Sequence, residues 1–213
     1  MKMKELPFIT SKSRIEALTD GVYAIAMTLL ALNLIIPEVI EEMNEVHIRE
    51  ILSGMVLQLD DYILSFMLLA IFWIIQNEQM HYIRKTDRPL IWIQIFSLIF
   101  IVLVPATTSL IAHFGDFQIC DILFEMNILI IGLLLLCGWF YTKRNPHLMH
   151  ESADKETIAR QKIKPLLIVI FSVMALPISF LVPGWSTSLY FLLPVLILLS
   201  TLRPERHGTS LSK

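Results

Sequence analysis

The stretch RIEALTDGVYAIAMTLLALNLIIP, residues 14–37, is an apolar helical sequence with an acidic residue near its start. The segment from Gly21 to Ile36 would rise about 24 Å as an α-helix, less than the ~30 Å of a hydrocarbon core. We therefore expect the helix to begin before Thr19 and Asp20, so that Asp20 lies within a membrane span. A carboxylate there costs roughly 2.5–3.5 kcal/mol unless it faces protein or water, which makes Asp20 a candidate functional residue. The alternative is that Thr19 or Asp20 caps a helix that begins later.

The composition of the whole chain is typical of an integral membrane protein. Its 213 residues are 55% hydrophobic and 17% charged, with a mean hydropathy of +0.67, too apolar for a water-soluble domain of this size. Cys120 and Cys137 lie in one apolar segment, which predicts neither a disulfide framework nor a zinc site. His147 and His150 lack a nearby third ligand, so we expect no metal site there. We also expect no cofactor, no nucleic-acid partner and no enzymatic activity.

Long apolar blocks predict the fold class. Spanning the membrane takes about 20 helical residues, and non-helical backbone at that depth would be left unpaired. We predict an all-α integral membrane protein, one domain over residues 1–213, with six transmembrane helices. Their predicted ranges are 15–36, 58–80, 89–112, 119–141, 164–182 and 185–201.

The distribution of basic residues predicts the orientation. Sixteen of the 17 Lys and Arg residues flank the spans on one side, and only Arg49 falls on the other. Because basic loops stay in the cytoplasm, we expect both termini there, in a multi-pass protein of the cell membrane. The other side begins with PEVIEEMNEVHIREILSGMVLQL, residues 37–59, which turns from acidic to apolar at helical spacing. Two interpretations remain open for it: an amphipathic helix on the outer leaflet, or a solvated connector.

The first predicted helix has two distinct stripes. Ile25, Leu29 and Leu32 fall on one face with Thr28 beside them, and Leu18 and Gly21 continue this stripe toward the start of the helix. At 100° per residue Asp20 lies about 140° from Ile25 and is expected to face neighbouring helices. Periodicity alone leaves open whether the aliphatic stripe meets lipid, protein or a pore.

Several polar residues of the second and third predicted helices match Asp20 in depth. Each needs a hydrogen bond where water is absent. We expect Asp20 and Thr19 to share a network with Gln76, Asn77 and Gln94, which would fix the rotation of the first helix. Two tryptophans lie at the same level, Trp73 and Trp92.

The stretch RIEALTDGVYAIAMTLL resembles the Arg-x-x-x-Phe-Ser-Asp signature of the transmembrane protein 175 family of potassium channels. The resemblance continues through SFMLLAIFW, IRKTDRPLIWIQIFSL and LVPATTSLIAHF, residues 65–73, 83–98 and 103–114. It covers the first half of the chain, whereas the later spans are similar only in hydropathy. It implies a homotetramer in the lipid bilayer, with four copies of the first helix around a central pore, and permeant potassium ions in place of any cofactor.

The resemblance also implies roles for individual residues. The signature Arg and Asp correspond to Arg14 and Asp20, while Leu18 and Thr19 stand where Phe and Ser are usual. Gln76 or Asn77, and Gln94, stand where relatives usually have His and Asn, so a pH response that depends on an imidazole is not expected. Ile25 would form the narrowest constriction. Further pore-facing positions would be Thr28, Leu29 and Leu32.

The expected mechanism is a hydrophobic constriction without a carbonyl-lined filter, because no TVGYG-like loop is present. The Thr28 hydroxyl would replace part of an ion's hydration shell and favour potassium modestly. Alternatively, that hydroxyl bonds back to the carbonyl of Ala24. Two other functions remain open: a secondary transporter or proton-coupled carrier, whose helices would break at Pro105, Pro177 or Pro194, and a structural membrane scaffold.

Overall fold

The structure, a computed structural model, is helical throughout the described chain. It describes residues 11–32, 45–115, 117–150, 158, 160–182 and 186–202, so residues 33–36 of the first predicted span lie outside it. The α-helices are α1 (Lys12–Leu32), α2 (Glu45–His81), α3 (Arg88–Phe114), α4 (Gln118–Arg144), α6 (Ile163–Leu181) and α7 (Leu192–Leu202). Two 3-10 segments are η1 (Pro146–Leu148) and η2 (Ser186–Phe191). The predicted all-α fold with six helices is confirmed, and five of the helices are long and apolar enough to span a membrane.

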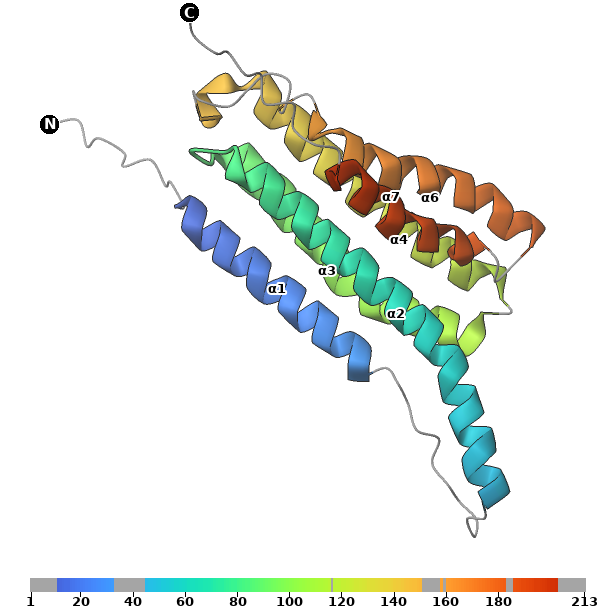
Figure 1. The fold of residues 1–213 in the computed structure, drawn as a ribbon. Helices are drawn as coiled ribbons and strands as arrows, with labels where there is room; N and C mark the ends of the chain where they lie inside the picture. Colours follow the sequence, from blue (N-terminus) through green and yellow to red (C-terminus); the bar gives the residue numbers. More distant parts are fainter. Residues whose placement is uncertain are drawn as a thin grey trace, which may run out of the picture.

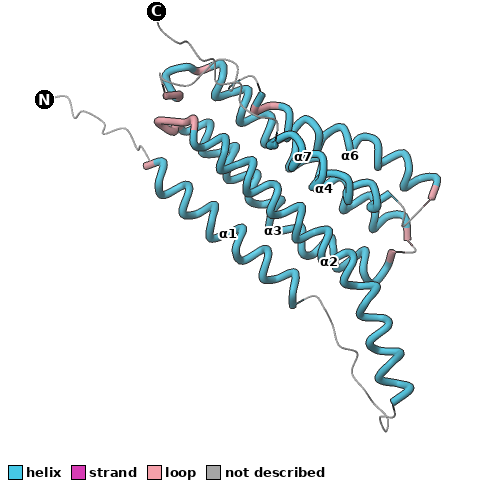
Figure 2. The backbone as a smooth tube through the Cα atoms, viewed as in Figure 1, coloured by secondary structure: helices cyan, strands magenta, loops and turns pink. Residues whose placement is uncertain are grey.

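The helices form one bundle in which α1 lies at an edge (Figure 1). α1 packs mainly against α2 and α3, while α4 packs between α3 and α6. Figure 2 shows that loops occur only at the helix ends. One end of the bundle carries every described Lys and Arg except Arg49, and we call it the basic end. The opposite end is the far end.

Polar contacts hold the basic end together. Asp87 caps α3 by accepting a hydrogen bond from the backbone N–H of Leu90 at 3.1 Å, and its second oxygen accepts from the Tyr141 hydroxyl of α4 at 2.5 Å. The backbone N–H of Arg84 donates to the carbonyl of Leu148 at 2.7 Å. Lys164 at the start of α6 pairs with Glu78 of α2 at 2.5 Å. These contacts hold the ends of α2, α3, α4 and α6 together at the basic end.

α2 is longer than predicted. It is one continuous helix of 37 residues, which corresponds to a length of about 55 Å. Its first part extends past the far end of the other helices (Figure 1). The prediction of an amphipathic helix separate from the second span is therefore wrong from Glu45 onward, because Glu45–His81 is one helix. Residues 37–44 of that segment lie outside the described chain.

The last predicted span consists of two helix types. The 3-10 segment η2 runs directly into α7, and Pro194 lies in the first turn of α7, where a proline is tolerated. Because a 3-10 helix rises about 2.0 Å per residue, the two together reach about 28 Å. α3 and α6 continue through Pro105 and Pro177 without interruption. The broken helices expected of a transporter are therefore not formed in these described spans.

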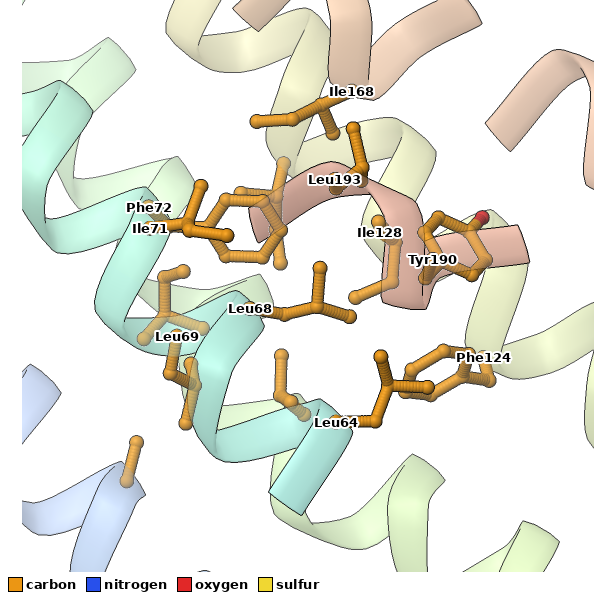
Figure 3. Close-up of a cluster of buried hydrophobic side chains, with 14 of the residues drawn as sticks. Leu64, Leu68, Leu69, Ile71, Phe72, Phe124, Ile128, Ile168, Tyr190 and Leu193 are labelled. Carbon is orange, nitrogen blue, oxygen red and sulfur yellow. The ribbon is translucent and has the colours of Figure 1, made fainter. Parts of the chain in front are cut away.

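Residues of all six α-helices and of η2 form the apolar core, and Figure 3 shows the part of it between α2, α4, α6, η2 and α7. Leu68, Phe72, Ile128 and Leu193 are completely buried there. α4 and α6 approach closely at Gly132, where an added Cβ would lie 3.0 Å from the Cγ2 atoms of both Ile168 and Val169.

Candidate functional site

α1 has one buried face and one exposed face. The buried residues recur at intervals of three or four, the spacing of a single helix face. They are Ile15, Thr19, Tyr23, Ala26 and Leu30. The opposite face is apolar and exposed in the single chain: the exposed fraction is 58% for Ile25 and 75% for Leu32. Leu18, Thr28 and Leu29 are exposed on the same side.

Asp20 is linked to α2 at the edge of the helix pair. It lies eight residues after the first residue of α1, so it is not the cap of this helix. Its Oδ1 accepts a hydrogen bond from the indole N–H of Trp73 at 2.8 Å, and both side chains are partly exposed. Asp20 therefore joins α1 to α2 beside the exposed stripe.

A second, buried cluster joins α1, α2 and α3. The Tyr23 hydroxyl donates to Oε1 of Gln76 at 3.0 Å, and Nε2 of Gln76 donates to Oε1 of Gln94. Nε2 of Gln94 lies 3.8 Å from the sulfur of Met80. Each amide thus finds a partner inside the bundle, where an unpaired polar group would be costly.

The structure divides the predicted network into these two clusters. Gln76 and Gln94 meet directly, but Asp20 bonds to Trp73 and not to either amide. Among the described residues, the buried Thr19 and the half-buried Asn77 belong to neither cluster. Trp92, at the same depth, is exposed on α3.

Sequence reasoning missed Tyr23. The available signal was its spacing, because Tyr23 follows Thr19 by four residues and therefore shares its face.

The remaining signature residues lie on the outward side of α1. Arg14 is exposed in the first turn, at the basic end. The Thr28 hydroxyl donates to the carbonyl of Ile25 at 2.8 Å, three residues back, rather than to that of Ala24. This bond uses the hydroxyl proton and leaves the oxygen able to accept or to coordinate a cation. An added Cβ on Gly21 would meet nothing within 4 Å, so the exposed stripe is open there.

The exposed stripe, Thr28 and the two clusters all lie within the part of the chain that is similar to known proteins. A sequence profile described as the endosomal/lysosomal potassium channel TMEM175 matches residues 14–105, which run from the first turn of α1 into α3.

Individual relatives extend this similarity over most of the chain. A protein of Chryseobacterium sp. (strain P1-3), named as a potassium channel, is 26% identical over 92% of this chain and 97% of its own length. One of Streptomyces collinus, also named as a potassium channel, is 23% identical over 73% of this chain and 76% of its own. A Gallus gallus protein named as the endosomal/lysosomal proton channel TMEM175 is 32% identical, over 50% of this chain and 22% of its own.

A solved structure has the same fold. The crystal structure described as a lysosomal potassium-selective channel TMEM175 homolog from Chamaesiphon minutus aligns with a TM-score of 0.74 and 20% identity. The alignment covers 90% of this chain and 98% of that one. Taken together, the profile match, the relatives of similar length and this alignment show that the chain is similar in sequence to TMEM175 potassium channels and has their fold.

Proposed function

We propose that this chain is one subunit of a homotetrameric potassium channel in which the exposed stripe of α1 lines the conduction path. The stripe consists of Leu18, Gly21, Ile25, Thr28, Leu29 and Leu32. Three of the similar bacterial proteins are named as potassium channels, and the matched profile includes the whole described stripe. The matched profile and the named relatives describe ion channels rather than enzymes.

The observation that carries the proposal is the two-faced nature of α1. Its inner face is fixed by apolar packing and by the Tyr23 hydroxyl, while its outer face is exposed in the single chain. α1 lies at an edge of the bundle (Figure 1), which leaves its exposed face open to other copies of the chain. Gly21 favours such close approach, because small residues let membrane helices pack tightly.

Ile25 is proposed to form the gate. Four isoleucine side chains at one level of the axis would exclude water, and ions cannot cross an aliphatic constriction that is dry. Leu29 and Leu32 continue the apolar wall toward the far end, and Thr28 supplies oxygen atoms beside it. Opening would then require a small rotation or outward tilt of α1.

The two polar clusters are proposed to set the resting rotation of α1. The bond from Trp73 to Asp20 and the bond from Tyr23 to Gln76 restrain the helix from different sides. We place the basic end in the cytoplasm, following the distribution of Lys and Arg.

Replacing Ile25 tests the gate. Ile25→Asn should wet the constriction and raise potassium flux into reconstituted vesicles about 10-fold or more, since each 1.4 kcal/mol taken off the barrier is a factor of ten. The matched control is Ile99→Asn, a similarly exposed isoleucine on α3, which should leave flux unchanged. Equal flux in wild type and Ile25→Asn, with normal assembly, would remove Ile25 from the gate.

A further inference from the structure

The far end of α4 buries two acidic side chains that the proposed pore does not use. Asp121 and Glu125 are four residues apart, one helical turn, and both are completely buried. Ionisable groups inside a membrane-spanning segment are costly and mark functional positions by default.

Hydroxyl groups from two other elements surround Glu125. Ser179 of α6 and Ser186 of η2 lie beside its carboxyl group, and Tyr190 of η2 is within electrostatic reach. Both carboxyl oxygens of Glu125, the Ser186 Oγ and the Tyr190 hydroxyl are buried without a hydrogen-bond partner among the described residues. Several unpaired polar atoms therefore meet in one buried volume, where each would be costly if left so.

The charges around this cluster are negative. Asp61 of α2, with Asp60 beside it, lies within electrostatic reach of Asp121. α6, η2 and α7 contribute no charged side chain at this end in their described parts. His113 of α3 is exposed, with its Nδ1 2.8 Å from the carbonyl oxygen of Ser109 on its own helix.

The described basic side chains are distant from the cluster. Arg144 lies at the opposite end of α4, about 28 Å from Glu125 along the helix axis. Lys164 is paired with Glu78 at the basic end. Arg49 precedes Asp61 by 12 residues on α2, or about 18 Å.

Two carboxylates one turn apart cannot both stay charged in a low-dielectric interior without a compensating positive charge. A proton needs no cavity, and the described residues show no group of three acidic or metal-binding side chains that could hold a metal ion. We infer that Asp121 and Glu125, with the Ser179, Ser186 and Tyr190 hydroxyls, form a proton-binding site inside each subunit.

The bound proton links α4 to the segment that precedes α7. A neutral Glu125 carboxyl can donate one hydrogen bond and accept others, so it can pair with the Ser186 hydroxyl that lies beside it. Loss of the proton places like charges together and draws water between η2 and α4. Because exposed carboxyls in the unfolded chain release their protons near pH 4, the folded chain binds more protons at neutral pH. Its stability therefore falls as pH rises.

Thermal unfolding of the purified full chain in detergent tests this linkage. Between pH 5 and 8.5, the melting temperature of the wild type should fall as pH rises. The fall should be about 3–5 °C for each pH unit over which unfolding releases one proton. Glu125→Gln keeps the shape of the side chain but cannot ionise, so its melting temperature should depend clearly less on pH. Identical slopes in the two proteins would overturn the inference.

Infrared spectroscopy provides a second measurement, which does not depend on whether Glu125→Gln folds. The wild type at pH 7 should show the carbonyl stretch of a protonated carboxylic acid, and Ser186→Ala should shift that band by removing a hydroxyl that lies beside the Glu125 carboxyl group. Absence of the band at pH 7 would overturn the inference. A second outcome would also overturn the inference. At fixed pH, the melting temperature of the wild type would rise with sodium, potassium or calcium relative to a bulky organic cation, and that of Glu125→Gln would not. This result would indicate a cation site.

Discussion

At the scale of single residues, α1 is restrained by contacts of different exposure. The bond between Asp20 and Trp73 lies at the surface of the single chain, and its acceptor is a carboxylate oxygen. The contact between Tyr23 and Gln76 is buried, so breaking it would leave a hydroxyl and an amide unpaired. The two contacts therefore restrain the rotation of α1 from its exposed edge and from its buried face.

Thr28 gives the sharpest test at this scale. Thr28→Val keeps the side-chain shape but removes the oxygen, which should lower the potassium-to-sodium permeability ratio about 2–5-fold, the loss expected for a weak oxygen contact of about 0.5–1 kcal/mol. The measurement is the bi-ionic reversal potential in a planar bilayer. Thr28→Ser retains the oxygen and should retain the ratio. An unchanged ratio in Thr28→Val would show that the hydroxyl serves only its bond to the Ile25 carbonyl.

The sequence predicted the position of Asp20 inside the helix because span length is a simple physical constraint, and α1 does begin well before it, at Lys12. It did not predict which polar groups pair. Depth matching brings Asp20, Gln76 and Gln94 to one level, but the direction of each side chain depends on the relative rotation of three helices. That rotation follows from packing of the complete bundle, which no local pattern encodes.

At the scale of elements, apolar runs located the later spans well. The predicted ranges 89–112 and 164–182 correspond to α3 at Arg88–Phe114 and α6 at Ile163–Leu181. The predicted span 58–80 agrees with the apolar part of α2, Leu59–His81, but the helix itself begins earlier, at Glu45. Counting apolar residues does not find this extension, because a helix satisfies its backbone hydrogen bonds in water as well as in lipid. It also could not foresee that η2 adopts the longer rise of a 3-10 helix.

The close approach of α4 and α6 can be tested at Gly132. Gly132→Val should force Ile168 and Val169 aside and cost about 1–3 kcal/mol, the usual range for overpacking a core. Thermal unfolding in detergent measures the loss. Gly138→Val is the control, because a Cβ on Gly138 would make an ordinary 3.5 Å contact with Ile93, and it should lose less. Equal losses at the two positions would show that the helix contact tolerates added volume.

At the scale of the whole molecule, the single chain leaves the apolar stripe of α1 uncovered. Exposed apolar residues are ordinary on a membrane protein, because lipid also covers them. The distinguishing feature of α1 is that its uncovered face combines aliphatic residues with Gly21 and Thr28. Assembly through this face depends on residues of other copies, which the sequence of one chain cannot arrange in space.

Gly21 tests the proposed assembly. Gly21→Leu has open space in the single chain and should even strengthen α1, since Leu favours a helix over Gly by about 0.8 kcal/mol. If four α1 helices meet at the axis, the larger side chain should separate them and shift the protein from tetramer to smaller species. Native mass spectrometry measures this directly. Cys137→Leu, at an exposed position on α4, is the control and should leave assembly unchanged. An intact tetramer in Gly21→Leu would indicate that α1 does not approach its copies there.

The uninterrupted length of α2 has a practical consequence. Only Leu59–His81 of this helix is needed to cross the bilayer, so its first fourteen residues form a rigid rod about 21 Å long beyond the span. A fluorophore or a small folded domain attached at Glu45 would be held away from the lipid headgroups at a fixed distance. Any tilt of the subunit would be magnified at that tip, which makes it a natural place to observe motion of the channel optically.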